Sequence, residues 1–271
     1  MTGSPSLIAV GGTTSLAWLA VDLGIEGKVA LVTGATRGIG LGIAQHLAAE
    51  GARVAVVART AAEVRRIADE MNGFGVAADV LTADGCTRAV EETRHNLGPI
   101  EILVNNFGAR AGTSWRDTRV AEFEEAFRGN LSVSARMTEL VLPQMLERGW
   151  GRIVLISSVF GREWGGAPAY NAAKAAENSY VKSLAREVAS KGVTVNAVAP
   201  GSILWEGGGW HRRRHADPEG IAEFVRREMP LGRFGTVEEV AAVVAFVCSA
   251  QASLLNGACM PVDGGQGRSI L

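Results

Sequence analysis

The sequence has 271 residues, of which 47% are hydrophobic, enough to build a substantial core in one large α/β domain or two small ones. Its 27 Lys and Arg residues nearly balance 28 Asp and Glu residues, which gives a net charge of -1 at pH 7. This balance lacks the positive field that binds nucleic acid or an anionic membrane, so we expect a small-molecule ligand.

The first twenty residues differ in character from the rest. Residues 6–21 are fairly apolar, but no Lys or Arg precedes residue 28, and glycines and threonines interrupt the run. A secretory signal begins with basic residues, and a membrane-spanning helix needs a longer apolar run. We predict a poorly ordered extension over residues 1–20 and one domain over residues 21–271. The three cysteines and four histidines lack metal-ligand spacing, so we expect no metal and a cytoplasmic protein.

From residue 28 onward, short β-branched apolar runs alternate with amphipathic stretches of helical length. We expect strands over residues 28–33, 53–58, 74–79, 101–106, 152–157 and 193–199. Nearly continuous apolar strands separated by helices indicate a parallel sheet covered on both faces. The pattern predicts a single doubly wound Rossmann-type α/β domain, whose ligands bind beyond the carboxyl ends of the strands.

The first expected strand runs into TGATRGIG at residues 33–40, and a helix follows. A strand, a glycine-rich turn and a helix N-terminus together direct backbone N–H groups and the positive end of the helix dipole at a pyrophosphate. Gly34, Gly38 and Gly40 have the spacing GxxxGxG, not GxGxxG. A plain tight turn would also use such glycines, so the loop indicates a dinucleotide site only together with other motifs.

Two arginines indicate which dinucleotide binds. An NAD site usually has an acid at the end of the second strand, whereas an Arg accommodates a 2′-phosphate. Here Arg59 follows that strand and Arg37 lies in the loop. Two guanidinium groups can bind a phosphate that carries nearly two negative charges, although either Arg alone could be a solvated surface charge. We therefore predict NADP(H) as the cofactor.

The reacting groups are expected after the fifth strand. Ser157 and Ser158 end that strand, and Tyr170 and Lys174 share one face of the next helix at i and i+4. A phenol ordinarily has a pKa of about 10, and an ammonium at about 4 Å stabilises its anion by roughly 4 kcal/mol at an effective dielectric of 20. The spacing is common by chance on exposed helices. Beside a nucleotide loop, it suits Tyr170 to act as a general acid while Ser158 polarises a carbonyl oxygen.

These motifs resemble those of the short-chain dehydrogenase/reductase family over about residues 25–265. The resemblance is carried by TGATRGIG, Asp79 in ADV, NNFG (105–108), Asn130, ISS (156–158), YNAAK (170–174), PGSI (200–203) and VDGG (262–265). It implies the strand order 3-2-1-4-5-6-7 and a homotetramer or homodimer. Within the family, SLAREVASKGVTVNAVAPG (183–201) looks most like the 3-oxoacyl-[acyl-carrier-protein] reductases.

The resemblance also implies residue roles. The catalytic set is Asn130, Ser158, Tyr170 and Lys174, in which Asn130 holds a water that relays protons to Lys174, and Lys174 also binds the nicotinamide ribose. Asp79, Val80 and Asn105 are expected to line the adenine and its ribose. With the glycine-rich loop and the two arginines argued above, the predicted cofactor-binding residues are Gly34, Thr36, Arg37, Gly38, Ile39, Gly40, Arg59, Asp79, Val80, Asn105, Gly108, Tyr170, Lys174, Pro200, Gly201 and Ile203.

Three positions depart from the family pattern. Phe107 replaces the usual Ala, so its ring is expected near the nicotinamide pocket or turned into the core. The interval from Ser158 to Tyr170 is one residue shorter than the commonest spacing, which leaves Ser157 as an alternative catalytic serine. Trp205 stands where the family often has a Thr that meets the carboxamide, a role that Ser202 or a backbone group would then fill.

Substrate choice is expected in the loops over residues 159–169 and 201–220. The second loop contains three consecutive glycines, which suits a mobile lid closing aromatic surface over a ligand, although its tryptophans could instead fill a subunit interface. Our substrate candidates are Phe107, Trp164, Trp205 and Trp210.

The run HRRRH at residues 211–215 has three interpretations. His211 and His215 have i, i+4 spacing, but no third metal ligand accompanies them. A solvated basic face balanced by Asp217 and Glu219 is the commonest arrangement. The third interpretation is an anchor for an anionic handle, such as the phosphopantetheine of an acyl carrier or coenzyme A.

The sequence therefore predicts an enzyme that transfers hydride between NADP(H) and a carbonyl or secondary alcohol, most like a 3-oxoacyl-thioester reductase. A reductase of a sugar, steroid or specialised-metabolite ketone is the alternative within this chemistry. Enoyl reduction is less favoured, because relatives with that activity generally space Tyr and Lys further apart. A non-catalytic NADP(H)-binding sensor or scaffold is the alternative from another class.

Overall fold

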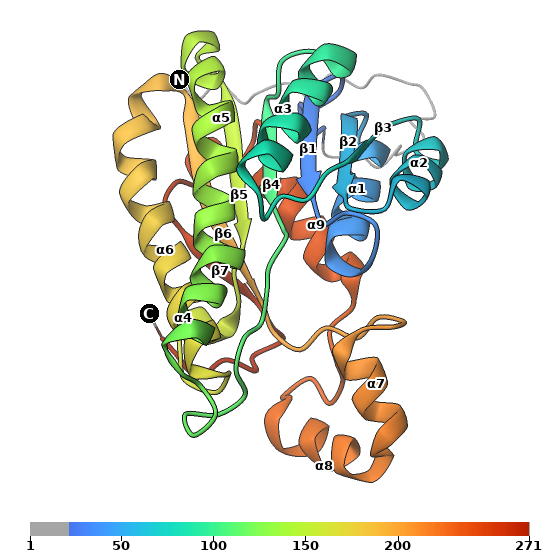
Figure 1. The fold of residues 1–271 in the computed structure, drawn as a ribbon, viewed down its shortest axis with the longest axis vertical. Helices are drawn as coiled ribbons and strands as arrows, with labels where there is room; N and C mark the ends of the chain where they lie inside the picture. The colour runs from blue at the N-terminus through green and yellow to red at the C-terminus, as the bar shows by residue number, and fades with distance from the viewer. Residues whose placement is uncertain (1–21, 271) are drawn as a thin grey trace, which may run out of the picture.

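The computed structural model describes residues 22–270. The poorly ordered extension expected over residues 1–20 lies outside the described residues. The described part contains a seven-stranded parallel sheet with helices on both faces, as expected (Figure 1).

The strand order is β3-β2-β1-β4-β5-β6-β7, which confirms the order that the resemblance implied. The strands are β1 (Val29–Thr33), β2 (Arg53–Ala58), β3 (Phe74–Ala77), β4 (Ile102–Asn105), β5 (Gly151–Ile156), β6 (Val193–Pro200) and β7 (Cys259–Val262). The third strand stops at Ala77 and not at residue 79, so Asp79 lies in the turn beyond the sheet edge. No range was expected for β7, which pairs with β6 from Ala197↔Cys259 to Pro200↔Val262.

Each face of the sheet has its own apolar core. On one face, α1 (Gly38–Ala49), α2 (Ala61–Glu70) and α9 (Val237–Val247) pack against side chains such as Val32 and Val104. On the other face, α3 (Ala83–Leu97), α5 (Val133–Arg148) and α6 (Pro168–Val188) pack against side chains such as Leu31 and Leu103. The strands β1, β5 and β6 are buried along their whole length, which accounts for their nearly continuous apolar sequences.

Two further segments connect the sheet to the site. The helix α4 (Val120–Phe127) continues through a π-helical turn (Arg128–Ser132) into α5. The loop after β6 carries α7 (Gly209–Ala216) and α8 (Pro218–Glu228), which project beyond the carboxyl edge of the sheet in Figure 1. The segment expected as a lid is thus a pair of helices. Short turns η2 (Val159–Gly161) and η3 (Ala189–Lys191) flank α6.

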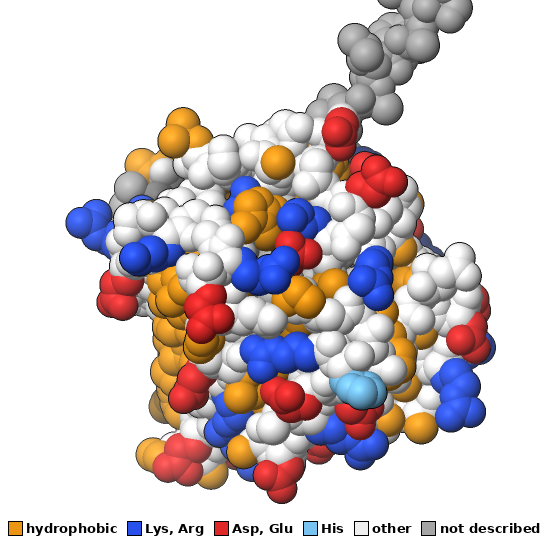
Figure 2. Space-filling model, turned by 90° about the horizontal axis from the view of Figure 1, so that it is seen from above, with side chains coloured by type: hydrophobic (Ala, Val, Ile, Leu, Met, Phe, Trp, Pro, Cys, Tyr) orange, Lys and Arg blue, Asp and Glu red, His pale blue; other side chains and the backbone are white. Residues whose placement is uncertain are grey.

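The surface carries charges of both signs (Figure 2), as the near-zero net charge predicts, and the three cysteines, all within the described residues, form no disulfide. Figure 2 shows acidic and basic side chains interspersed over the face seen there. Among residues 22–270, no helix combines the length and the apolar character that crossing a bilayer requires. The three cysteines are free, and burial raises the pKa of the Cys248 thiol to about 12, so this thiol is a packing group.

Candidate active site

The glycine-rich loop forms a tight cradle between β1 and α1. Gly34 and Gly38 have φ of 64° and 55°, which disfavour any other residue. A Cβ on Gly40 would lie 2.3 Å from Asn106 Nδ2 and 2.5 Å from the Gly34 carbonyl oxygen. The loop therefore brings bare backbone and the N-terminus of α1 to the cavity edge, which is the arrangement that binds a pyrophosphate.

Side chains at the end of β1 and just after β4 hold this cradle. The Thr33 hydroxyl, fully buried, accepts hydrogen bonds from the backbone N–H groups of Asn106 (3.1 Å) and Phe107 (3.0 Å). Asn106 Nδ2 donates to the carbonyl oxygens of Thr33 (2.9 Å) and Gly34 (3.2 Å). The segment after β4 is thus fastened to the end of β1, the two strands that lie side by side where the strand order reverses.

A cavity of about 370 Å³ opens over this edge of the sheet. It brings together many of the residues expected from the sequence: Gly34, Arg37, Ile39, Gly40, Phe107, Gly108, Ser157, Ser158, Tyr170, Lys174, Pro200, Gly201 and Trp205. Asn106, Arg110 and Ile156 also line it and were not expected. One continuous space therefore joins the glycine-rich loop to the Tyr–Lys pair.

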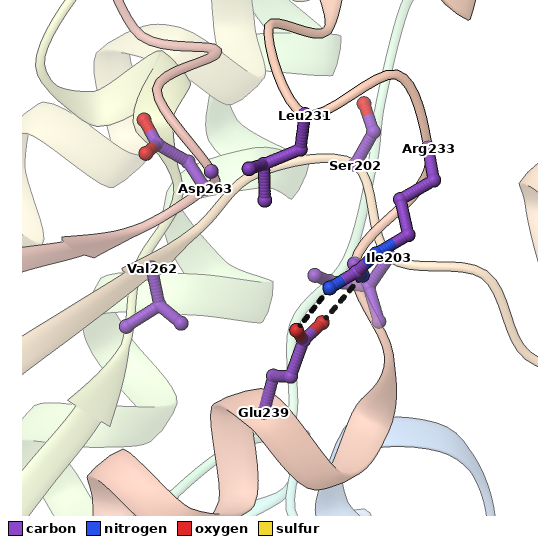
Figure 3. Close-up of a pocket in the computed structure, with 9 residues that line it drawn as sticks. Ser202, Ile203, Leu231, Arg233, Glu239, Val262 and Asp263 are labelled. Atoms are coloured by element: carbon purple, nitrogen blue, oxygen red, sulfur yellow. Dashed lines mark hydrogen bonds and ion pairs between the residues drawn. The ribbon is translucent and has the colours of Figure 1, made fainter.

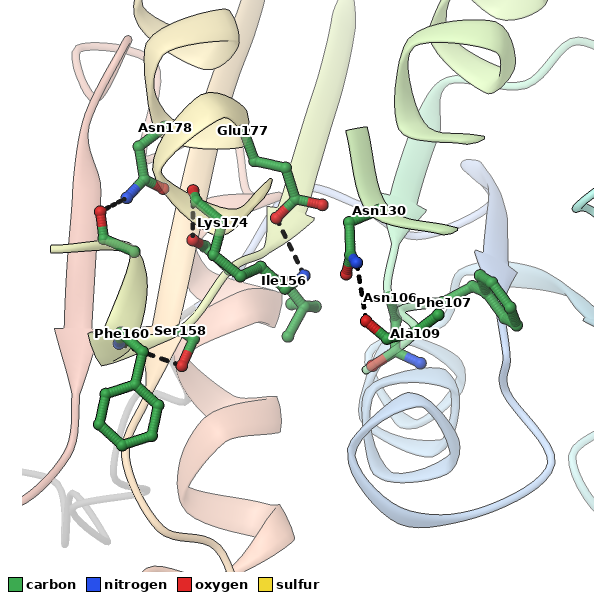
Figure 4. A network of polar contacts seen from close by, with 12 residues as sticks. Asn106, Phe107, Ala109, Asn130, Ile156, Ser158, Phe160, Lys174, Glu177 and Asn178 are labelled. Carbon is green, nitrogen blue, oxygen red and sulfur yellow. Dashed lines mark hydrogen bonds and ion pairs between the residues drawn. The ribbon is translucent and has the colours of Figure 1, made fainter. Parts of the chain in front are cut away.

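The helix α6 presents Tyr170 and Lys174 to this cavity. The helix begins with Pro168 in its first turn, a favourable position for Pro, and it is rich in alanine. Lys174 is 3% exposed, and its Nζ donates to the Ile156 carbonyl oxygen (2.8 Å) and to Glu177 Oε2 (2.9 Å) (Figure 4). Its Nζ lies 5.8 Å from the centre of the Tyr170 ring.

Glu177 is a buried carboxyl that the sequence reasoning missed. Burial raises the pKa of the Glu177 carboxyl, and the adjacent Lys174 ammonium opposes this rise. An acid three residues after the lysine, on an otherwise buried helix face, was the available signal. Arg110, also missed, places its guanidinium 5.3 Å from the centre of the Tyr170 ring.

Asn130 sits within the π-helical turn between α4 and α5. Its Nδ2 donates to the carbonyl oxygens of Ala109 (2.8 Å) and Ala126 (2.7 Å), while its buried Oδ1 has no hydrogen-bond partner among the described residues. A Cβ on Gly108 would lie 2.9 Å from this Oδ1 and 3.4 Å from Lys174 Nζ. The Asn130 amide oxygen and the Lys174 ammonium therefore converge on the same glycine. A water that bridged the two groups would need space between them, and the absence of a side chain at Gly108 leaves that space open.

The two serines at the end of β5 differ in their bonding. The Ser157 hydroxyl donates to the Lys174 carbonyl oxygen at 3.4 Å and is thereby turned to α6. The Ser158 oxygen accepts from the Phe160 N–H at 3.2 Å, which leaves its hydroxyl proton free for an acceptor in the cavity. This bonding favours Ser158 as the group that contacts a ligand.

Of the residues expected around the adenine, its ribose and the 2′-phosphate, Arg37 lines the large cavity, whereas Arg59, Asp79, Val80 and Asn105 do not. Arg37 and Arg59 are exposed, and neither forms an ion pair within residues 22–270. Both amide atoms of Asn105 are buried without a hydrogen-bond partner in the described chain. Unpaired buried polar atoms and free guanidinium groups are what a polar, anionic ligand would satisfy.

The aromatic substrate candidates occupy different places. Phe107 lines the cavity and also packs against the core on the α3–α5–α6 face. Trp205 lies against the loop, where a Cβ on Gly38 or on Gly208 would come within 2.8 Å of its indole ring. Trp210 instead stacks on Phe224 at 4.6 Å between ring centres and contacts Phe234, while Trp164 is 82% exposed.

Ser202 and Ile203 line a second, smaller cavity of about 100 Å³ (Figure 3). Gln266 accepts from the Ser202 N–H at 2.7 Å and donates to its hydroxyl at 3.0 Å. The Ser202 hydroxyl is therefore held by Gln266, and it is not among the residues that line the larger cavity. A pair of bonds from Arg233 to Glu239 closes one side of this second cavity.

The basic run lies on α7, with Arg212, Arg213 and Arg214 exposed. The imidazole nitrogens of His211 and His215 are 3.3 Å apart, but the part of the chain that the structure describes contains no cluster of three or more potential metal ligands. Arg213 stacks over Trp210 at 5.0 Å. A solvated basic face is the arrangement that these contacts favour.

Known proteins resemble this chain over nearly all of the described residues. The protein-family model described as Enoyl-(Acyl carrier protein) reductase matches residues 34–266. The 3-oxoacyl-[acyl-carrier-protein] reductase of Aquifex aeolicus is 37% identical over 252 residues, which cover 90% of this chain and 99% of that protein.

Two solved structures have the same fold. L-sorbose reductase from Gluconobacter frateurii, complexed with NADPH and L-sorbose, has a TM-score of 0.86 at 30% identity and covers 92% of this chain and 100% of its own. A 7α-hydroxysteroid dehydrogenase complexed with NADH and 7-oxo glycochenodeoxycholic acid has a TM-score of 0.83 at 29% identity, covering 90% of this chain and 96% of its own.

The Thr33 hydroxyl provides a test of how the cradle is held. Thr33→Val keeps the shape of the side chain but leaves the N–H groups of Asn106 and Phe107 without an acceptor, so we expect the free energy of unfolding to fall by about 1–3 kcal/mol. Urea denaturation measures this change. Thr33→Ser, which retains the hydroxyl, is the control and is expected to lose clearly less; equal losses for the two variants would contradict this account.

Proposed function

This chain belongs to the short-chain dehydrogenase/reductase family, and from that premise we propose which of its residues carry out the reaction and on which substrate. It is an oxidoreductase that transfers hydride between NADP(H) and a carbonyl or secondary alcohol. We propose that Asn130, Ser158, Tyr170 and Lys174 are the catalytic residues. The observation that carries this proposal is the single cavity that joins the glycine-rich loop to Ser158, Tyr170 and Lys174.

The residues present fit the cofactor. The cradle of Gly34 and Gly40 would hold the pyrophosphate, and the unpaired amide of Asn105 would meet the adenosine half. Arg37 and Arg59 would hold the 2′-phosphate, because both guanidinium groups lack an acidic partner in the described chain. When bound, the cofactor supplies or accepts the hydride at the carbonyl carbon.

Side chains of the protein supply the proton that the carbonyl oxygen takes up. In reduction, Ser158 donates a hydrogen bond to the carbonyl oxygen and polarises it, and Tyr170 transfers its phenolic proton to the oxygen as negative charge develops there. The Lys174 ammonium stabilises the phenolate that remains. A water held between Asn130 Oδ1 and Lys174 would return a proton to the site from the solvent side, since both polar groups converge at Gly108.

For the substrate, we propose a 3-oxoacyl thioester. The identity of 37% to the Aquifex aeolicus reductase over 90% of the chain supports this class. The basic helix α7 begins four residues after Trp205, which lines the cavity, and would receive an anionic acyl carrier or coenzyme A. The second candidate is a free sugar or steroid ketone, which Trp205 at the cavity wall and the two solved relatives favour. We further propose that the protein is cytoplasmic and a homotetramer or homodimer, and that residues 1–20 are an extension outside the catalytic domain.

Cofactor preference tests the two arginines. The double variant Arg37→Ala/Arg59→Ala is expected to lose about 10- to 100-fold in kcat/KM for NADPH per charge-assisted contact removed, with kcat/KM for NADH little changed. Steady-state kinetics with both cofactors measure the ratio. Arg65→Ala, which removes an exposed charge from α2, is the control. A wild-type preference for NADH would refute the assignment.

Tyr170→Phe tests the enzymatic role against that of a non-catalytic sensor. The change removes the phenolic hydroxyl, so we expect kcat to fall by about 10²- to 10⁴-fold. The Kd for NADPH should rise by no more than about tenfold, because at most one cofactor hydrogen bond is lost. Tyr180→Phe, on the same helix, is the control and should keep full activity. If Tyr170→Phe still bound NADPH and replaced the wild-type protein in living cells without loss of function, the enzymatic role would be abandoned.

A panel of substrates distinguishes the two substrate classes. We expect NADPH oxidation with a 3-oxoacyl thioester to exceed, in kcat/KM, that with free sugar, steroid and simple ketones. An enoyl thioester in the same panel tests the activity named in the matching family description, and we expect no turnover there. Highest turnover of a free ketone would support the second candidate, and turnover of the enoyl thioester alone would refute carbonyl reduction.

A further inference from the structure

Glu177 is a buried acid to which the reaction described above gives no role. It lies three residues after Lys174 on α6, and its side chain is 2% exposed. Figure 4 shows the Glu177 carboxylate directed at the Lys174 ammonium, with Oε2 accepting a hydrogen bond at 2.9 Å. The pair is therefore an ion pair almost wholly removed from water.

Stability alone does not account for an acid at this position. Removing a carboxylate and an ammonium from water costs several kcal/mol for each ion, and well-packed apolar residues often replace such pairs without loss. Neighbouring core positions of α6, such as Ala173 and Val181, are apolar. The acid at residue 177 therefore needs another reason, and its partner is the proposed catalytic lysine.

The ion pair determines how the ammonium is used. An ammonium has three N–H donors. In Lys174, one donates to the Ile156 carbonyl oxygen and one to Glu177, so a single donor remains for the side that faces Gly108 and the Asn130 carbonyl oxygen. Glu177 thus limits both the direction and the net charge of the group that acts on Tyr170.

We propose that Glu177 is a positioning residue that, as a carboxylate, orients the Lys174 ammonium and offsets the positive charge acting on the Tyr170 phenol. This inference rests on the proposed catalytic roles of Tyr170 and Lys174. The acid does not touch the substrate and acts through Lys174.

Few other charges face Glu177. Burial, and to a smaller extent the Glu177 charge, raise the pKa of the Cys259 thiol on β7, and Arg162, after η2, donates to the Cys259 carbonyl oxygen. The strand β6 has no ionisable side chain. The charged residues of α4 and the π-helical turn are Glu122, Glu124, Glu125 and Arg128, and within residues 22–270 Glu177 forms its ion pair with Lys174. Lys174 is therefore the dominant partner of Glu177.

The expected effect on the pH profile has a definite sign. In alcohol oxidation, Tyr170 must be a phenolate to accept the proton, and a nearby positive charge stabilises the phenolate. Two cations face its ring, the Lys174 ammonium at 5.8 Å and the Arg110 guanidinium at 5.3 Å from the ring centre, and the Glu177 variants leave Arg110 unchanged. Glu177→Gln leaves the ammonium without its counter-charge, so the rising limb of kcat/KM against pH should move to lower pH by about one to two units. Glu177→Asp keeps the charge and should retain the wild-type position of the limb.

Glu187→Gln, which removes an exposed acid from the same helix, is the matched control for a non-specific charge effect. The Kd for NADPH, measured by fluorescence titration, should stay within a few-fold of wild type in all three variants, while kcat changes in Glu177→Gln. If the Glu177→Gln variant were active and its kcat/KM depended on pH as in the wild type, the role of Glu177 would be overturned. The proposed function would still stand.

The cofactor-free protein offers a readout that does not need activity. Lys174→Met and Glu177→Met should each lower the midpoint of urea denaturation, because each leaves a buried charge unpaired. The double variant should unfold at a higher urea concentration than the sum of the two single losses predicts. Additive losses would overturn the ion pair. Absence of any reductase activity would refute the proposed function, and this cycle would then decide the ion pair by itself.

Discussion

A buried ammonium must find acceptors, and the requirements of Lys174 shape the whole reacting end of the molecule. Its side chain crosses from α6 to the last carbonyl group of β5, so helix and strand are tied together at the sheet edge. Glu177 supplies the counter-charge from the same helix. The remaining donor faces the space between Gly108 and Asn130, where only a residue without a side chain leaves room. Tyr170 lies one turn earlier on the same face of the helix, half-buried at the cavity wall.

The nucleotide end depends on a different constraint, the close approach of backbone to backbone. Gly40 packs against the Gly34 carbonyl oxygen and the Asn106 amide, and the Thr33 hydroxyl joins β1 to the segment after β4. Because β1 and β4 are adjacent but far apart in the chain, this joint fixes the crevice at the point where the strand order reverses. The two ends of the site are thus carried by one rigid sheet edge.

Much of this arrangement could be predicted from the sequence, because it follows from local patterns. Apolar runs placed six strands within two residues of their ends, and the motif series placed the glycine-rich loop and the Tyr–Lys pair in one cavity. The π-helical turn at Asn130 could not be foreseen, since an inserted residue in a helix leaves no clear change in apolar periodicity. The ion pair between Glu177 and Lys174 could not be predicted either, because an acid within an amphipathic helix is normally assigned to its solvated face. Trp210 was grouped with Trp205 by proximity in sequence, yet α7 turns it into a cluster with Phe224 and Phe234.

The indole ring of Trp205 lies between Gly38 and Gly208, so the segment that leads into α7 rests directly on the start of α1. For protein engineering, this contact sets the boundary of the exchangeable unit. The α7–α8 hairpin projects from the sheet edge and could be transplanted as a module between homologous scaffolds, but only with Trp205 and its two glycines together. A graft that began after Trp205 would pair the indole ring of the host protein with the hairpin of the donor protein. A poor fit between the two would displace the ring from Gly38, and so would disturb the nucleotide cradle as well as the substrate pocket.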